Sequence, residues 1–349
     1  MAEYISFQPK DFFNPVAYTG TASGAKVVTG VGFQPDNIFF KLRTGVYAWA
    51  AIDAVRGVTK ILECDADSAE ATNSNYLASF DSDGFSTTAT QDTGTNSSGD
   101  YMGFSWKAGT TSGLTGGTIT PSAYSFNATS GFGMYKFTGT GANANIAHGL
   151  GKIPKFIIIK NLTDADDWTC YHQGAGNNAF MVMNTSAAEG AGTSLWNDTT
   201  PTSTLFYLGN NGKTNASAAN MMAYVFTDVP GYSKFGTYNG NGNANGPFCY
   251  TGFKPAYVMA KRIDSTGYWR VLNTQMDIYN PAYHVLFANA TDAQGTTPGG
   301  TQYDTDFLSN GFKIRTSIAS SNANGGRWLY AAFAESPIVS SNDIPTTAR

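Results

Sequence analysis

Short apolar runs separated by polar, uncharged segments recur along the chain, and one arrangement of them occurs three times. In each copy a Gly-x-x-Pro turn leads into an apolar run: Ile38-Phe39-Phe40, Ile157-Ile158-Ile159 and Tyr257-Val258-Met259. Runs of this kind are typical of strands that are buried on both faces. A turn bearing Gly or Asp follows each run, and a second run that begins with Trp comes next. This order predicts a β-hairpin in every copy.

Four residues keep a fixed spacing in the three copies. A Lys lies six positions after the Pro, and a Trp lies fourteen positions after it. An aromatic-x-Gly pair lies upstream, with seventeen positions from the aromatic residue to the Pro. We interpret the fixed residues as a structural signature of the repeat, which consists of Gly32, Pro35, Lys41 and Trp49; Gly151, Pro154, Lys160 and Trp168; and Gly252, Pro255, Lys261 and Trp269.

The copies define the predicted domains. Each copy closes on an aromatic strand, and the period of about 100 to 120 residues is far above that of solenoid repeats. We predict an all-β fold with three tandem antiparallel β-sandwich domains, jelly-roll-like and related by the internal repeat. The predicted boundaries are an N-terminal arm at 1–17, sandwich repeats at 18–108, 135–229 and 230–337, a linker at 109–134 and a polar C-terminal tail at 338–349.

The arm at 1–17 is aromatic and poor in helix-forming residues, with Phe7, Phe12 and Phe13 beside Pro9 and Pro15. We expect it to form a strand packed on the first repeat. The alternative is an attachment arm that docks on a partner.

Composition narrows the class of protein. Of the 349 residues 39 are Gly, while 14% are aromatic and 13% charged, as in strand-and-turn proteins with polar loops. The net charge of −4 and the absence of a basic patch argue against nucleic-acid binding. The sequence has no apolar run of about 20 residues, so we expect no membrane insertion. It has no evident signal peptide, and we expect the protein to be made in a reducing cytoplasm. Three unpaired cysteines predict buried free thiols, at Cys64, Cys170 and Cys249.

The repeated Trp and Lys each allow two interpretations. A Trp on a hairpin strand usually packs across a sheet and anchors a core, and we favour this because a shared core needs a shared anchor. The alternative is a platform on which a sugar stacks. We expect the Lys to be a solvated strand end, or else a contact for an acidic partner. The Gly-x-x-Pro turn is interpreted as structural, because Gly permits unusual backbone angles and Pro fixes φ before the strand.

Catalytic and cofactor motifs are absent from the sequence. It has no Gly-x-Ser-x-Gly elbow and no Walker loop, and the glycine-rich stretch 240–246 has the wrong spacing for a dinucleotide. The histidines are isolated, and three different polar residues at one repeat position argue against a shared catalytic or metal site there. We therefore predict no catalytic residues and no cofactor. The histidines are His148, His172 and His284, and His172 occupies the repeat position of Asp53 and Asn273.

A cluster of acidic residues raises the question of a calcium site. Asp164, Asp166 and Asp167 lie in the hairpin turn of the second copy, but their spacing matches no EF-hand loop. We interpret them as a turn and predict no metal site.

Several blocks of the chain resemble a family of bacteriophage virion proteins, common in phages of marine and aquatic bacteria and described as tail-fibre-like or structural. The resemblance covers nearly the whole chain, apart from the linker and the turn at Thr204-Leu205. The blocks are Tyr4-Ile5-Ser6-Phe7-Gln8-Pro9, Tyr18-Thr19-Gly20, Gly32-Phe33-Gln34-Pro35-Asp36, Asp53-Ala54-Val55-Arg56-Gly57, Pro230-Gly231-Tyr232-Ser233-Lys234-Phe235, Tyr238-Asn239-Gly240-Asn241-Gly242, Gly252-Phe253-Lys254-Pro255, Asp306-Phe307-Leu308-Ser309-Asn310-Gly311-Phe312 and Ala331-Ala332-Phe333-Ala334-Glu335. They keep a fold rather than a site, so the resemblance implies a role by association and supplies no catalytic residues.

The resemblance implies a non-enzymatic virion structural protein, an exposed fibre or appendage subunit that contacts the host surface or other virion proteins. Its expected location is the virion, assembled in the host bacterial cytoplasm. Expected partners are other virion proteins of the capsid or tail, through 1–17, further copies of the chain, and a glycan or protein of the host surface. The alternatives are a capsid decoration protein and, with less support, a glycan depolymerase or a lectin.

Overall fold

The computed structural model describes residues 7–89, 94–295, 302–339 and 345–346. Nearly all of its regular structure is antiparallel strand, and the α-helices of this described part are single turns, α1 (Gly212–Asn215) and α2 (Ala319–Asn322). The predicted all-β class is therefore confirmed. The many β-branched and aromatic residues in short runs, separated by Gly- and Asn-rich turns, are the physical reason.

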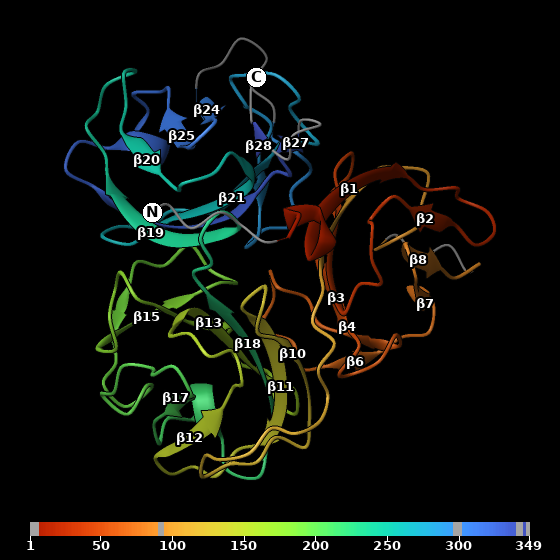
Figure 1. Ribbon diagram of the computed structural model, residues 1–349, viewed down its shortest axis with the longest axis vertical. Helices are drawn as coiled ribbons and strands as arrows, with labels where there is room; N and C mark the ends of the chain where they lie inside the picture. The colour runs from red at the N-terminus through yellow and green to blue at the C-terminus, as the bar shows by residue number, and fades with distance from the viewer. Residues whose placement is uncertain (1–6, 90–93, 296–301, 340–344, 347–349) are drawn as a thin grey trace.

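Three lobes surround a common centre (Figure 1), and each contributes one inner sheet with the same strand order. In lobe 1 the order is β1 (Phe13–Thr19), β9 (Asp100–Trp106), β3 (Asn37–Leu42) and β4 (Ala50–Asp53). In lobe 2 it is β11 (Phe132–Thr138), β18 (Asn220–Thr227), β13 (Pro154–Asn161) and β14 (Thr169–His172). In lobe 3 it is β19 (Ser233–Asn239), β26 (Arg327–Ala334), β21 (Pro255–Arg262) and β22 (Trp269–Asn273). The predicted hairpins are β3–β4, β13–β14 and β21–β22.

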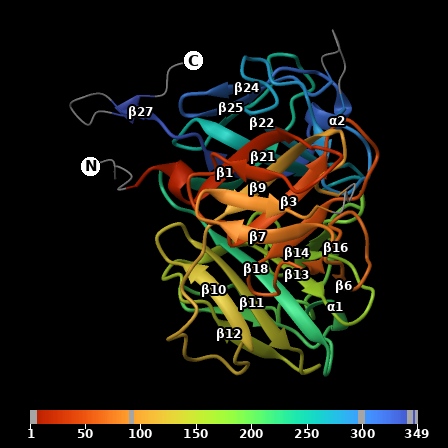
Figure 2. The same cartoon turned by 90° about the vertical axis from the view of Figure 1, so that its right-hand side faces the viewer.

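A smaller outer sheet covers the outside of each inner sheet and makes a sandwich with it. Lobe 1 has β2 (Val27–Thr29), β8 (Gly84–Thr87) and β7 (Leu77–Asp81). Lobe 2 has β12 (Ala144–Ala147) and β17 (Leu205–Leu208). Lobe 3 has β20 (Phe248–Tyr250), β25 (Gly311–Ile314) and β24 (Thr305–Leu308). Each lobe therefore has its own core, and Figure 2 shows β1, β9 and β3 beside β7 of the outer sheet in lobe 1.

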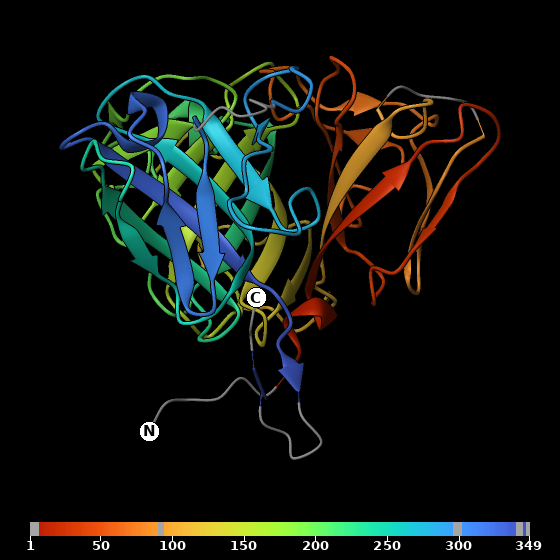
Figure 3. The ribbon, with the colours of Figure 1, turned by 90° about the horizontal axis from the view of Figure 1, so that it is seen from above.

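The remaining strands extend or fringe these sheets. Lobe 2 gains β10 (Ala123–Asn127), β15 (Ala179–Val182) and β16 (Gly190–Ala191), and lobe 3 gains β23 (Leu286–Phe287). Lobe 1 carries the short pair β5 (Lys60–Ile61) and β6 (Ala71–Thr72). The chain ends with the pair β27 (Ile338–Val339) and β28 (Pro345–Thr346), which Figure 3 shows near the 3-10 turn η1 (Pro9–Asp11) at one end of the molecule.

The inner sheets are buried on both faces, which explains their continuous apolar runs. Ile38 and Phe40 point into the core of lobe 1, whereas Phe39 and Lys41 lie on the opposite face of the same strand. That second face meets the equivalent faces of the other two inner sheets in one central cluster. A shared core therefore joins the lobes, in place of three domains that each bury only their own interior.

Two predicted boundaries change because of the strands that the segments contain. Residues 13–17 of the predicted arm lie in β1, which pairs along its length with β9, so they form the expected strand on the first repeat and belong to lobe 1. Residues 123–127 of the predicted linker are β10, paired with β11. Residues 1–6 of the arm, and 340–344 and 347–349 of the predicted tail, lie outside the described residues.

The aromatic-x-Gly pairs occupy equivalent places, each at the end of the first strand of an inner sheet. A Cβ atom added at Gly20, Gly139 or Gly240 would lie 1.8, 2.0 or 2.2 Å from a backbone carbonyl oxygen of the loop before the closing strand. Only glycine fits this close approach of two backbones, which accounts for its presence in all three copies.

Candidate functional site

The three signature tryptophans lie where one lobe meets the next. The indole N–H of Trp49 donates to the Phe287 carbonyl oxygen at 2.8 Å, which links lobe 1 to lobe 3. Trp168 of lobe 2 donates to Glu63 of lobe 1 at 2.9 Å, and Trp269 of lobe 3 donates to Val182 of lobe 2 at 2.9 Å. The three bonds form a closed cycle around the centre of the molecule.

The tryptophan side chains themselves are buried, with 3%, 0% and 3% of Trp49, Trp168 and Trp269 exposed. An indole with no exposed face has no surface on which a sugar could stack, so that interpretation is wrong. Their place in the central cluster is that of a core anchor, and the core they anchor is the one between lobes.

The signature lysines form a second cycle parallel to the first. Each Nζ donates to a backbone carbonyl of its own hairpin turn, six positions on, and to one carbonyl of the neighbouring lobe. The contacts to the neighbouring lobe are Lys41 to Thr291 at 2.8 Å, Lys160 to Asp67 at 2.8 Å and Lys261 to Ser186 at 3.1 Å. The contacts within the turns are to Tyr47, Asp166 and Gly267.

Burial of these lysines corrects the expectation of solvated strand ends, since none of the three has measurable exposure. Burial lowers the pKa of Lys41, Lys160 and Lys261 to about 8 in each case, because a low-dielectric interior disfavours the charged amine. Carboxylates near Lys41 and Lys160 oppose this shift, and at Lys261 burial is the cause. Two carbonyl acceptors match the two hydrogens of a neutral amine, so deprotonation leaves the contacts intact.

The shift of Lys261 predicts a pH-dependent stability. Its folded pKa of about 8 lies below the value of about 10.4 in an unfolded chain, so between these values the unfolded state binds more protons. Its contribution to the free energy of unfolding therefore rises by about 1.4 kcal/mol per pH unit from pH 8 to 10 and falls on return to pH 7. Urea unfolding at pH 7, 8, 9 and 10 gives the free energy of unfolding of the wild type and of Lys261→Met. We expect the wild type to gain stability relative to the variant as the pH rises above 8. Lys10→Met, at an exposed lysine, is the control; a Lys261→Met difference constant with pH contradicts the prediction.

The Gly-x-x-Pro turns also have equivalent backbone geometry. Gly32, Gly151 and Gly252 have φ of +89°, +67° and +85°, a region that other residues rarely adopt. The turns precede β3, β13 and β21, and Pro154 and Pro255 are the first residues of their strands. These turns set the direction from which each central strand enters its sheet.

The repeat position occupied by Asp53, His172 and Asn273 differs in its contacts. His172 Nε2 lies 3.2 Å from the Tyr330 carbonyl oxygen across the boundary between lobes 2 and 3, and burial lowers its pKa to about 4, so it is neutral. The Asn273 carboxamide oxygen accepts from two backbone N–H groups of the next turn, at Gln275 and Met276. The prediction that this position holds no shared catalytic group stays a prediction, and its three members make three different structural contacts.

Asp53 holds a buried ion pair at the boundary between lobes 1 and 2. Its Oδ2 lies 2.6 Å from Nε of Arg56, and both side chains are fully buried. The Tyr224 hydroxyl of lobe 2 donates to the same oxygen at 2.8 Å. Arg56 also donates to the Ala51 carbonyl at 2.9 Å, so the charges are satisfied inside the protein.

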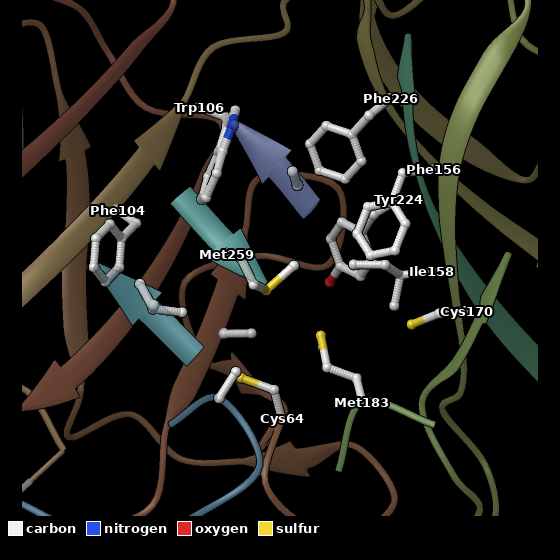
Figure 4. Close-up of a cluster of buried hydrophobic side chains, with 14 of the residues drawn as sticks. Cys64, Phe104, Trp106, Phe156, Ile158, Cys170, Met183, Tyr224, Phe226 and Met259 are labelled. Atoms are coloured by element: carbon white, nitrogen blue, oxygen red, sulfur yellow. The ribbon is translucent and has the colours of Figure 1, made fainter. Parts of the chain in front are cut away.

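An apolar cavity of about 50 Å³ lies at the centre of the molecule. Figure 4 shows side chains from all three lobes around this region, among them Trp106, Phe226 and Met259. The lining includes the sulfur atoms of Cys64, Met183 and Met259 but no charged group. Such a cavity has room for small apolar atoms and offers nothing to orient a polar substrate.

Sequence reasoning missed two sets of side chains that serve the turns. A buried Asn accepts from the backbone N–H after each aromatic-x-Gly pair, and an Asp or Asn accepts from the backbone N–H of each signature Trp. For the buried Asn, the signal in the sequence was a Ser/Thr-Asn pair that begins five or six residues before the closing strand. For the second set, it was a polar residue sixteen or twenty positions after the Trp. They are Asn96, Asn215 and Asn322, and Asp65, Asn184 and Asn289.

The remaining predicted site residues do not come together. His148 bonds to the Thr202 carbonyl in lobe 2, while His284 pairs with Asp277 in lobe 3. Asp166 and Asp167, in the hairpin turn of lobe 2, form ion pairs with Lys213 of α1. Within the described ranges no three His, Cys, Asp or Glu side chains are grouped as metal ligands require.

Two sequence expectations concern thiols and membrane insertion. The three cysteines are free and buried, as predicted, and burial raises the pKa of each thiol. In the part of the chain that the structure describes, neither helix has the length or apolar character needed to cross a bilayer.

Comparison with known proteins gives one result. Residues 8–337 match the model of a family described as a domain of unknown function, DUF7483. No curated protein and no solved structure matches the chain. The matched range includes all three lobes, so the family unit is the whole assembly and not a single lobe.

Proposed function

The chain belongs to the DUF7483 family, and we propose that this member is a non-enzymatic structural protein of a bacteriophage virion, an exposed fibre or appendage subunit. The observation that carries the structural part is the use of the signature residues. All six signature Trp and Lys side chains are buried at the lobe boundaries, where they bond to backbone carbonyls. Burial and bonding of this kind support a structural role for the recurring residues.

The virion part of the proposal is supported by the resemblance of the sequence blocks, most of which lie in the described lobes. Asp53 and Arg56 belong to one such block and form the buried ion pair between lobes 1 and 2. Tyr232 belongs to another and lies fully buried beside Phe333 at the link between lobes 2 and 3. Residues of these blocks therefore pack the three lobes against one another. A firmly packed unit is what a particle component needs.

Attachment to other virion proteins is proposed for the end of the molecule at which η1 and the residues before β27 meet. The backbone N–H of Lys10 donates to the Ser336 hydroxyl at 2.9 Å, so these two segments lie together. The host-facing surface is then formed by the polar loops elsewhere on the three lobes.

The test uses a phage whose genome encodes this chain. Purified particles are analysed by quantitative mass spectrometry and by gold-labelled antibody in electron microscopy. We expect a constant copy number for each particle and label on an appendage. Label on the capsid would replace the appendage with a decoration role, and absence of the chain from purified particles would contradict a virion role. Shortening of host polysaccharide by the purified protein would contradict the non-enzymatic assignment.

A further inference from the structure

The outer sheets of the three lobes end on equivalent edge strands, β2, β12 and β20. Each edge strand has a buried central residue opposite a buried Phe of its neighbour: Val28 with Phe85, Ile146 with Phe206 and Cys249 with Phe312. This register makes the preceding residues, Val27, Asn145 and Phe248, equivalent. Backbone groups at such positions point away from the neighbouring strand, because alternate residues of a strand bond to the same side.

In lobe 2 this outward edge is covered by another part of the chain. The Asn145 N–H donates to the Thr118 hydroxyl at 2.8 Å, and the Asn145 carbonyl accepts from the N–H groups of Thr118 and Ile119 at 3.0 and 3.1 Å. Gly117 and Ile119 both form bridges with Ile146. An uncharged Gly- and Thr-rich segment, bent at Thr118, thus covers the outward edge of β12.

In lobe 3 the equivalent edge is open within the described part of the chain. The sheet order ends on β20, and Pro247 and Thr251 make backbone bonds to β25 that leave Phe248 facing outward. The side chains of Phe248 and Tyr250 are 43% and 65% exposed. β20 carries no charged residue, although exposed edge strands are usually protected by a charge, a bulge or a cover.

The edge of lobe 1 differs from this one in its chemistry. Lys26 immediately precedes β2, and Val27 is the one large apolar side chain of that strand with high exposure. A lysine beside an edge discourages pairing with another chain. Of the two edges that no described segment covers, β20 is therefore the one suited to a partner.

We propose that β20 is a docking site for an uncharged segment of another protein, whose backbone hydrogen-bonds to the outward edge of the outer sheet of lobe 3. The segment at 116–119, which bonds to the equivalent edge of lobe 2 at Asn145, shows how such an edge is covered. Backbone bonds to Phe248 supply affinity, and an apolar side chain of the segment packs against the rings of Phe248 and Tyr250. This assignment does not depend on the proposed virion role.

A second copy of the whole chain fits this edge less well. A stable interface between two globular subunits buries about 1,200 Å² or more, and a strand of three residues with two exposed rings is far smaller. A flexible segment needs only the strand and its two side chains, so the partner is expected to bring a flexible peptide segment.

The experiment uses a labelled synthetic peptide with the sequence of Leu114–Ser122 and the full-length protein. We expect saturable binding by fluorescence anisotropy, with a dissociation constant of about 0.1 to 1 mM, because few hydrogen bonds offset the ordering of a short peptide. Hydrogen exchange with mass spectrometry is expected to show new protection in residues 246–252.

Variants locate the site. Phe248→Pro removes the outward N–H without touching a bond to β25, and we expect about tenfold weaker binding. Val27→Pro makes the same change in lobe 1 and is the matched control with unchanged binding. Tyr250→Lys leaves the backbone N–H groups in place and adds a charge at the edge, and we expect it to weaken binding about fivefold. This variant tests the site if Phe248→Pro does not fold.

Three outcomes overturn the proposal. One is no saturable binding up to about 5 mM peptide, a concentration well above the expected dissociation constant. Another is protection outside 246–252 with equal affinity for all variants. The third is a wild-type dimer in sedimentation that Phe248→Pro converts to a monomer, since the edge would then belong to a second copy.

Discussion

Trp168→Ala is expected to lower the free energy of unfolding by about 4 to 6 kcal/mol. Removing a fully buried indole leaves a cavity, and such changes cost about 3 to 5 kcal/mol. The Glu63 carbonyl also loses its donor at 2.9 Å, which adds about 1 kcal/mol. Urea unfolding followed by circular dichroism measures the total, and hydrogen exchange measures where it acts. We expect the loss of protection on both sides of the boundary, near Trp168 and near Glu63.

The matched control for this prediction is Trp196→Ala. Trp196 is as deeply buried, but it lies in the core of lobe 2 and donates to the Ala179 carbonyl of the same lobe at 3.0 Å. A similar total cost is expected, with lost protection confined to lobe 2. If both variants lose protection in lobe 2 alone, Trp168 does not join the lobes; a cost under about 1.5 kcal/mol would remove its role as an anchor.

Asp53→Ala is expected to cost about 3 to 5 kcal/mol, because it leaves the fully buried Arg56 guanidinium without its nearest carboxylate. Glu70, at 3.4 Å, compensates only in part. The double variant Asp53→Ala/Arg56→Met removes both charges and is expected to be more stable than Asp53→Ala alone. A double-mutant cycle from urea unfolding at pH 7 measures the coupling.

Asp264→Ala is the control for the ion pair. Asp264 pairs with Arg262 at 3.0 Å, but both side chains are partly exposed, and surface pairs contribute at most about 1 kcal/mol. Equal costs for Asp53→Ala and Asp264→Ala would contradict the view that burial sets the importance of Asp53. So would a double variant that is less stable than Asp53→Ala.

Much of the local fold could be predicted from the sequence. The hairpins after Pro35, Pro154 and Pro255 are confirmed, since a glycine with positive φ and a proline before an apolar run specify the turn and the strand locally. The strand β10 was missed because 109–134 is rich in Gly, Thr and Ser, a composition typical of linkers. Tyr124 and Phe126 alternate with small and polar residues in 123–127, and this segment becomes a strand by pairing with β11.

The candidate site was found in part. The spacing singled out Trp and Lys, and the structure brings them to the lobe boundaries. Their chemistry could not be inferred, because the acceptors of Lys41, Lys160 and Lys261 in the neighbouring lobes lie 250, 93 and 75 positions away. A lysine at a strand end is usually solvated, and only a carbonyl brought from another lobe makes its burial tolerable.

The sequence by itself determined the all-β class, the turns and the side chains that recur, because these depend on residues near one another in the chain. The tertiary structure alone decided that three lobes share one core and which outer-sheet edge another described segment covers, since both depend on contacts between segments apart in the chain. An apolar run shows that a strand is buried on both faces, but it carries no information on which lobe covers the second face.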